Sequence, residues 1–221
     1  MSAESGVPTF RGEDGLWEGH HIEMVASPEG FERDPKLVQR FYNLRRAALK
    51  TVAPNAGHFA LARLEREWRG KFLLVTQNVD DLHERAGGKS LIHMHGELLK
   101  ARCRNCGAVC PWCEDLSSST RCEACEKTGD MRPHIVWFGE IPFELEVISG
   151  ALGSANIFLC IGTSGVVYPA AGFAHTAARR PECHLIEMDI ERTEISRHFH
   201  EHIVGTVAVE LPQMVERLLS A

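Results

Sequence analysis

Short apolar runs alternate with amphipathic segments along most of this chain, and this alternation limits the possible folds more than any other feature. Five runs have the length and composition of buried strands: residues 71–76, 90–96, 133–139, 156–162 and 184–190. Helical periodicity is found in residues 34–52, 54–68 and 168–180, and in the closing segment LPQMVERLLSA. Strands that alternate with helices predict an α/β fold with a parallel sheet.

Polar or glycine-containing segments follow these runs, at the ends where ligands usually bind. They read QNVDD, HMHG, WFGE, GTSG and MDIE in chain order. In α/β sheets, ligands bind beyond the carboxyl ends of the strands. We therefore expect the functional site to be assembled from these five segments.

Length and charge exclude several classes of protein. The chain has 221 residues, 44% of them hydrophobic, and a net charge of −6 without a lysine or arginine run. This charge disfavours nucleic acid as the main ligand. No apolar stretch is long enough to span a membrane, and residues 1–12 lack the features of a secretory signal. We expect a monomeric cytoplasmic protein with no membrane partner.

Six of the eight cysteines lie within 23 residues, as three C-x-x-C pairs. Clustered pairs of this kind, in a chain without a secretory signal, predict metal ligands rather than disulfides. The pair Cys103 and Cys106 is followed by glycine, and Cys122 with Cys125 forms the second plausible half of a tetrahedral zinc site. The middle pair, CPWC, is an alternative half or a redox pair.

A site of four thiolates has no open position for water or substrate, so its zinc is structural. The alternative is a loop of free, reduced cysteines. We expect an inserted zinc-binding module at residues 98–133, with residues 1–97 and 134–221 forming the main domain.

His93 and His95 are the best candidates for a general base, the usual role of histidine near neutral pH. They lie two positions apart at the end of an expected strand, so both side chains would leave the same face. Gly96 after His95 permits close approach of a ligand or of the backbone. Spacing alone does not choose between them, and each could instead be a structural histidine.

Two further groups could bind ligands. Gln77, Asn78 and Asp80 follow an apolar run, where their side chains suit a carboxamide, although a simple helix cap is equally compatible with the pattern. Tyr42 and Arg45 share one helix face, and together they suit a carboxylate. The plainer interpretation of this pair is a surface arginine packed over a tyrosine.

Taken together, these stretches resemble the sirtuins, the NAD-dependent protein lysine deacylases. The matching segments are SAESGVPTFRG (2–12), PNAGH (54–58), TQNVDDLHERAG (76–87), HMHGEL (93–98), RPHIVWFGE (132–140), GTSGVVYPAA (162–171) and the paired cysteines. They extend over nearly the whole chain. The resemblance implies a Rossmann-like NAD-binding domain plus the zinc module.

The resemblance also implies residue roles. It selects His95 as the base and gives His93 no role. The cofactor-binding positions that it implies are Ala3, Thr9, Phe10, Arg11, Gln77, Asn78, Val79, Asp80, Gly162, Thr163, Ser164, Asp189, Ile190, Glu191 and Val207. The substrate-binding positions are Tyr42, Arg45, Val136, Trp137, Phe138 and Gly139, with the last four pairing with an acylated-lysine peptide as an added strand.

The implied reaction transfers the acyl group from lysine to the ribose of NAD, releasing nicotinamide and O-acyl-ADP-ribose. Water must be excluded, because it would otherwise hydrolyse the cofactor. The Tyr-x-x-Arg pair resembles the subgroup that removes succinyl and malonyl groups, and implies that Tyr42 and Arg45 bind the distal carboxylate.

The sequence departs from the family pattern in three places. Sirtuins have a first strand and a Gly-Ala-Gly turn before the segment that matches residues 2–12, and we expect this strand to be missing here. Asp189 replaces the usual asparagine, and Cys110 with Cys113 is not part of the usual ligand set. The alternative function is a catalytically weak module that binds NAD or acyl-peptides.

Overall fold

The computed structural model describes residues 1–8, 16–17, 20–163, 168–193 and 195–220. Its strands are β1 Leu16–Trp17, β2 His20–His21, β3 Leu74–Thr76, β4 Leu91–His93, β5 Gly96–Cys103, β6 Val109–Pro111, β7 Met131–Ile135, β8 Ile157–Ile161, β9 His184–Asp189 and β10 Glu201–Val204. Its α-helices are α1 Ile22–Val25, α2 Pro28–Arg33, α3 Pro35–Leu49, α4 Ala56–Glu67, α5 Leu82–Arg85, α6 Leu145–Leu152, α7 Ala171–Ala178 and α8 Val207–Leu219, with 3-10 helices at Ser2–Ser5 and Ser196–His198.

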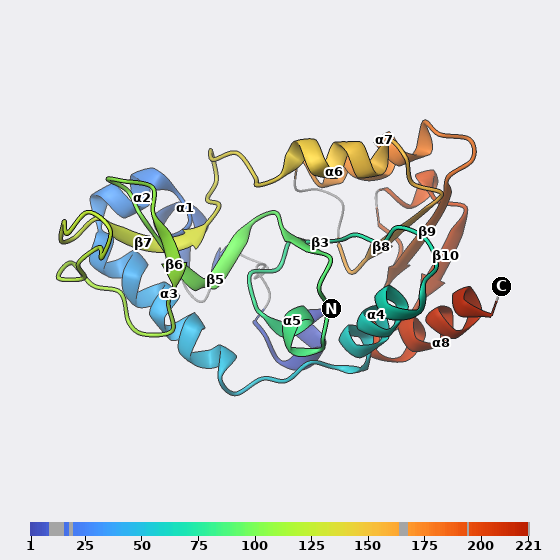
Figure 1. Cartoon of the computed structure of the whole chain (residues 1–221), viewed down its shortest axis with the longest axis horizontal. Coiled ribbons are helices and arrows are strands. Elements are labelled where there is room, and N and C mark those ends of the chain that lie inside the picture. Colours follow the sequence, from blue (N-terminus) through green and yellow to red (C-terminus); the bar gives the residue numbers. More distant parts are fainter. Residues whose placement is uncertain (9–15, 18–19, 164–167, 194, 221) are drawn as a thin grey trace.

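The parallel strands confirm the expected α/β class. Strands β10, β9 and β8 form one parallel sheet, and β3 pairs in parallel with β4 in a second sheet. Helices cover both faces of the larger sheet, with α6 and α7 above it and α4 and α8 below it in Figure 1. The expected single sheet is therefore divided into two parts among the described residues.

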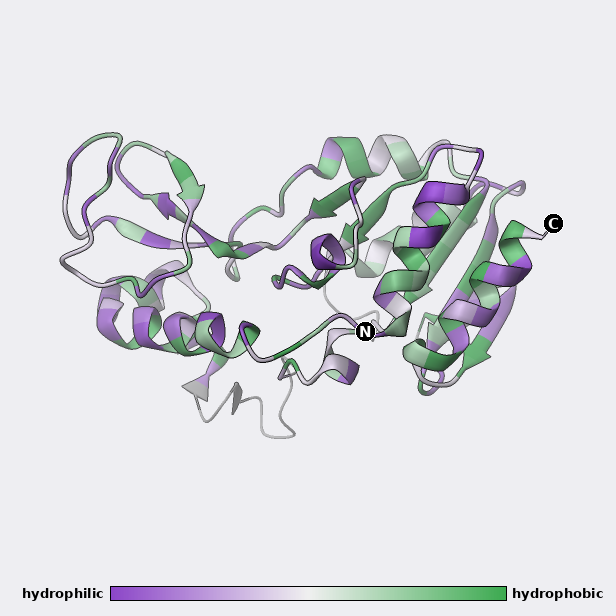
Figure 2. Ribbon diagram, turned by 60° about the horizontal axis from the view of Figure 1, so that its bottom comes forward, coloured by the Kyte–Doolittle hydropathy of each residue, from purple (hydrophilic) through white to green (hydrophobic). Residues whose placement is uncertain are grey.

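Alternation along β9 explains why helices cover both of its faces. Ile186 and Met188 belong to a cluster with α4 and α8, whereas Leu185 belongs to a cluster with α6 and α7. Successive side chains of a strand point to opposite faces, so a strand buried on both sides is apolar at almost every position. In Figure 2 the hydrophobic colour is continuous along β8, whose sequence is IFLCI, whereas β9 also carries hydrophilic residues such as Glu187.

The second lobe contains the cysteine-rich segment and lies at the left of Figure 1. Strand β5 pairs in antiparallel fashion with β6 and with β7. Residues 133–139 were expected to form a strand after the cysteine-rich segment, and β7 instead pairs with β5 in this lobe, outside the parallel sheets. Helix α3 packs against the lobe through a buried cluster that includes Phe41, Tyr42, Leu98 and Trp137.

Several elements differ from the expected ones. No helix or strand was expected before residue 34, but α1 and α2 form there, with the Ser27 hydroxyl accepting the Gly30 N–H at the start of α2. The last helix begins at Val207, earlier than expected, and contains Pro212. None of the helices among the described residues is long and apolar enough to cross a membrane.

A cleft of about 1960 Å³ separates the two parallel sheets and continues toward the second lobe. Residues of β3 and β8 line it, while β4 and β9 occupy the opposite edges of these two strands. The amide of Gln77 donates to the Thr163 hydroxyl at 3.2 Å, which joins the carboxyl ends of the two sheets. The segments expected to carry function meet at this end of the cleft.

Candidate functional site

The loop after β3 carries the first group of candidate residues. The Asn78 amide donates to the Ser2 hydroxyl at 2.8 Å, and the Asn78 N–H donates to the Thr76 hydroxyl at 3.0 Å. Asp80 is buried and accepts the Leu82 N–H at 3.2 Å. Asp80 thus caps the first turn of α5, and Gln77, Asn78 and Asp80 also line the cleft.

His95 lies in the turn between β4 and β5. Gly96 has φ +86°, and a Cβ there would lie 2.1 Å from the His134 carbonyl oxygen, so this turn requires glycine. The Nδ1 atom of His95 lies 3.2 Å from the Gln77 carbonyl oxygen. Because a carbonyl only accepts, Nδ1 carries the proton and Nε2 presents a lone pair. Burial lowers the pKa of His95, which outweighs the opposite effect of that carbonyl.

His93 has a different environment, although both histidines were expected on one strand face. Strand β4 ends at His93, so the two side chains do not share a strand. His93 Nδ1 lies 3.2 Å from the Asn78 carbonyl oxygen and Nε2 lies 2.8 Å from the Glu84 carboxylate. Burial works to lower the pKa of His93, but the Glu84 carboxylate outweighs it and raises that pKa. Both ring nitrogens of His93 are therefore engaged by the protein.

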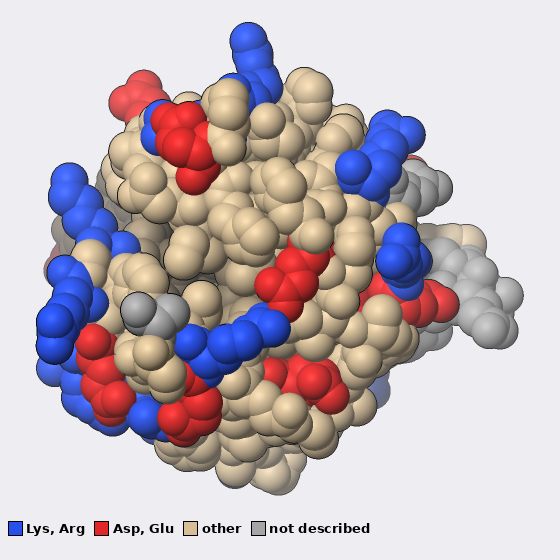
Figure 3. All heavy atoms as spheres, turned by 90° about the vertical axis from the view of Figure 1, so that its right-hand side faces the viewer, with Lys and Arg blue, Asp and Glu red and all other residues tan. Residues whose placement is uncertain are grey.

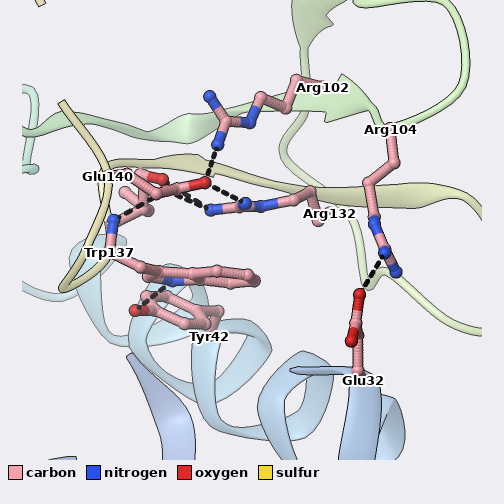
Figure 4. A network of polar contacts seen from close by, with 8 residues as sticks. Glu32, Tyr42, Arg102, Arg104, Arg132, Trp137 and Glu140 are labelled. Carbon is pink, nitrogen blue, oxygen red and sulfur yellow. Dashed lines mark hydrogen bonds and ion pairs between the residues drawn. The ribbon is translucent and has the colours of Figure 1, made fainter. Parts of the chain in front are cut away.

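Tyr42 and Arg45 lie on α3 and line the same cleft as His95. Both are buried, and the Tyr42 hydroxyl accepts the indole N–H of Trp137 at 2.9 Å (Figure 4). Burial raises the pKa of Tyr42, so its hydroxyl stays protonated at neutral pH. The interpretation of a surface arginine packed over a tyrosine is therefore wrong for this pair.

The segment expected to bind peptide follows β7. The N–H groups of Val136 and Phe138 donate to the carbonyls of His95 and Ala26, each at 2.9 Å. The Trp137 N–H donates to the Glu140 carboxylate at 2.8 Å. The Trp137 carbonyl accepts the Glu140 N–H at 3.0 Å, whereas the Gly139 N–H donates to no described residue.

Most of the remaining positions that were expected to bind the cofactor line the cleft. These are Ala3, Val79, Gly162, Thr163, Asp189, Ile190 and Glu191. Val207 is instead buried between α4 and β9 and does not line the cleft. Thr9, Phe10, Arg11 and Ser164 lie outside the described residues. At Gly162 the φ angle is +58°, and a Cβ would lie 3.0 Å from the amino nitrogen of Met1, so glycine suits this turn.

The four expected zinc ligands converge in the second lobe. The sulfur atoms of Cys103, Cys106, Cys122 and Cys125 all lie within 4.8 Å of one another, in a group that includes neither histidine. Two of the sulfur pairs are 3.7 Å apart. A tetrahedral zinc with Zn–S bonds of about 2.3 Å needs sulfur atoms roughly 3.8 Å apart, so the four thiols fit one zinc ion.

Some residues that shape the site were not identified from the sequence. Glu4 accepts the N–H groups of Val207 and Ala208, each at 2.8 Å, and so caps α8 from the other end of the chain. Glu84 holds His93, and Glu140 holds the loop around Trp137. Glu84 and Glu140 lie inside the recognised segments, but only the folded geometry reveals their partners.

Comparison with known proteins agrees with this geometry. The model of the Sir2 family matches residues 1–169. The chain belongs to the Sir2 family. An NAD-dependent protein deacylase of Vibrio parahaemolyticus is 52% identical over 222 residues, covering 100% of this chain and 92% of that protein.

Solved Sir2 structures share the fold. A Sir2 homologue in complex with NAD has a TM-score of 0.88 at 36% identity, over 99% of this chain and 86% of that one. A Sir2 protein bound to an acetylated peptide has a TM-score of 0.82 at 26% identity, over 98% of this chain and 88% of that one. The sirtuin resemblance and the α/β fold are thereby confirmed.

The residues of this Sir2 protein also fit its two cofactors. The four thiols fit one structural zinc ion, and the cleft of about 1960 Å³ has room for a dinucleotide. Amide, hydroxyl and carboxylate groups gather where the two sheets meet, at the carboxyl ends of parallel strands.

Proposed function

We propose that this protein removes acyl groups from protein lysines in an NAD-dependent reaction and accepts acyl chains that end in a carboxylate. The observation that carries the first part is His95, a neutral imidazole in the cleft whose Nδ1 proton is held by the Gln77 carbonyl. Its Nε2 bonds to no described residue, which suits a general base. The family membership supports the same reaction.

In this proposal the cofactor supplies the ribose carbon that receives the acyl oxygen and the nicotinamide that leaves. His95 accepts the proton of a ribose hydroxyl at Nε2, while the Gln77 carbonyl keeps the ring in the required tautomer. Gln77, Asn78 and Asp80 orient the carboxamide and ribose. Apolar residues around the cleft exclude water from the reacting atoms.

Tyr42 and Arg45 support the preference for acidic acyl chains. A buried guanidinium beside a protonated phenol offers a charge-assisted and a neutral donor to one carboxylate. An acetyl group has no carboxylate, so it gains nothing from this pair. We accordingly propose desuccinylation and demalonylation beside deacetylation.

The decisive experiment measures nicotinamide release from acetyl-lysine and succinyl-lysine peptides, with and without NAD. The matched variants are His95→Asn and His93→Asn, which remove one imidazole each from neighbouring positions. We expect His95→Asn to lose turnover by at least about a hundredfold, the range for a general base. A larger loss in His93→Asn than in His95→Asn would overturn the assignment of the base.

A second candidate is a binding module with little turnover, and the open cleft between β3 and β8 is the observation that favours it. Calorimetric binding of ADP-ribose by a protein that releases no nicotinamide with either peptide would support this alternative.

We also propose that the protein does not bind nucleic acid, that it is cytoplasmic and that it is a monomer. Basic (Lys, Arg) and acidic (Asp, Glu) side chains are interspersed on the face shown in Figure 3, and this face has no large basic patch, which supports a protein that does not bind nucleic acid. A zinc site of four thiolates suits a reducing compartment, which supports the cytoplasm. A monomer remains the expected state in solution.

A further inference from the structure

A partly buried network of charged groups holds the turn that follows β7 (Figure 4). The Glu140 carboxylate accepts Nη1 and Nη2 of Arg132 at 2.7 and 3.0 Å, and Nη2 of Arg102 at 2.6 Å. It also accepts the backbone N–H of Trp137 at 2.8 Å. These four hydrogen bonds restrain the Glu140 side chain to one conformation, and the bond from the Trp137 N–H thereby fixes the start of the turn.

The same network fixes the indole of Trp137. The Arg132 guanidinium carbon lies 3.2 Å from the centre of a Trp137 ring, and its Nη2 also donates to the Ile135 carbonyl at 2.8 Å. The indole also contacts Phe31, with ring centres 5.4 Å apart. Trp137 is 2% exposed, so neither translation nor rotation of the ring is available without breaking the ion pairs.

The fixed indole then acts on Tyr42. Its Nε1–H donates to the Tyr42 oxygen at 2.9 Å, and Tyr42 is fully buried. A phenol rotates its hydrogen to suit its partners, and an incoming donor occupies one lone pair of the oxygen. The Tyr42 hydrogen is then directed away from the indole, and Arg45 lies one turn further along the same helix.

We propose that Trp137 and Glu140 are positioning residues for acyl-chain specificity, because they set the direction in which the Tyr42 hydroxyl donates. The chain of contacts runs from Glu140 through Arg132 and the indole to the phenol. This inference rests on the proposed binding of an acyl carboxylate by Tyr42 and Arg45. It assigns to Trp137 a role distinct from pairing with the peptide backbone.

A double-mutant cycle tests the link between indole and phenol. Trp137→Phe, Tyr42→Phe and the double variant are compared by kcat/KM for succinyl-lysine and acetyl-lysine peptides at saturating NAD. We expect Trp137→Phe to lower the succinyl-to-acetyl ratio about tenfold, the size of one hydrogen bond to a buried partner. In the Tyr42→Phe background the same change should leave that ratio unaltered, because no hydroxyl remains to be directed.

Trp112→Phe is the matched control, since it is the same substitution in the second lobe. The Trp112 indole N–H is buried and has no partner among the described residues. Glu140→Gln provides a second variant, which keeps the Trp137 side chain but removes the charge of the carboxylate that holds it, with Glu140→Asp as the conservative rescue. We expect Glu140→Gln to lower the succinyl-to-acetyl ratio of kcat/KM, and we expect Glu140→Asp to give a ratio between those of Glu140→Gln and the unmodified protein.

Each outcome decides one claim. If Trp137→Phe lowers turnover of both peptides equally, or lowers the ratio by the same factor in the Tyr42→Phe background, the positioning role is overturned. The proposed acyl specificity is judged separately by Arg45→Met on the same two peptides. A normal ratio in Arg45→Met rejects that specificity, whereas a reduced ratio there with an unchanged ratio in Trp137→Phe rejects only the positioning role.

Discussion

The two histidines of the HMHG segment differ in the number of ring nitrogens that the protein itself occupies. His93 donates from both nitrogens, to the Asn78 carbonyl and to Glu84, whereas His95 donates only from Nδ1 among the described residues. A ring with two donated protons is a cation and a poor base. This difference favours His95, and it was invisible in the spacing of the two residues.

The lowered pKa of His95 predicts the pH dependence of the reaction. The base must be neutral, and burial keeps it neutral to a lower pH than an ordinary histidine, whose pKa is about 6.5. We expect kcat/KM to stay constant through neutral pH and to fall only below about pH 6.5. The measurement is a pH profile of nicotinamide release, and an acidic limb above that value would contradict a buried neutral base.

Arg45 gives a sharper prediction at the same scale. Arg45→Met keeps most of the side-chain length and removes the charge that would face an acyl carboxylate. We expect desuccinylation to fall by more than about tenfold, as for loss of a charge-assisted hydrogen bond, while part of the deacetylation remains. Equal losses on matched acetyl and succinyl peptides would refute the assignment.

At the scale of single elements, the start of α4 depends on a histidine. The Asn55 side chain accepts the Gly57 N–H at 3.0 Å, and His58 Nδ1 accepts the Asn55 N–H at 3.2 Å, which completes a capping box. His58 is fully buried against His83, and burial lowers the pKa of His58 to about 3. Protonation of Nδ1 would abolish its bond to Asn55.

This cap makes stability depend on pH. A histidine with a lowered pKa contributes stability that is complete above its unfolded pKa of about 6.5 and is lost as the pH falls toward the folded value. We expect the free energy of unfolding to fall by up to about 1.4 kcal/mol per pH unit below pH 6 from this residue. His58→Gln keeps a capping partner that does not titrate. In urea unfolding at pH 7.5 and 5, the free energy of unfolding of this variant should therefore change less with pH than that of the unmodified protein. An equal change in both proteins would exclude the cap as the cause.

The zinc module is the second element-scale case. Its buried cluster is Ala101, Cys103, Leu116, Cys122 and Met131, so two of its members are themselves metal ligands. A core this small is not expected to persist without its metal. We expect chelation, or Cys122→Ser, to expose residues 104–130 to proteolysis and to lower the melting temperature. Unchanged cleavage after complete zinc release would contradict this expectation.

At the scale of the whole molecule, the apolar runs predicted the parallel strands β3, β4, β8 and β9, because their apolar side chains pack into the clusters on the two faces of the sheets. Strand β10 was not predicted, because Glu201 and His202 leave it only two apolar residues. Strand β5 was missed because Glu97, Lys100 and Arg102 interrupt its apolar pattern. The site was predicted mainly through the family resemblance. The links between Glu4 and α8, and between Trp137 and Tyr42, join positions 203 and 95 residues apart, and no local pattern records such pairs.

The two sheets also leave main-chain groups unused. Strand β3 pairs only with β4 and β8 pairs only with β9 among the described residues, so one edge of each strand faces the cleft without a neighbouring strand. Unpaired edges act as templates for further strands. We expect light scattering from concentrated protein to fall when NAD is added, because a ligand in the cleft covers these edges; equal scattering with and without NAD would contradict this expectation.

The cleft therefore affects the solubility of the protein as well as its chemistry. The unpaired main-chain groups of β3 and β8 that border this cleft can bond to an extended backbone as well as to a bound ligand. Any chain with free main-chain donors and acceptors, including an unfolded copy of this one, competes for that space. Solubility and cofactor occupancy are then linked, since whatever fills the cleft removes the surface on which aggregates grow.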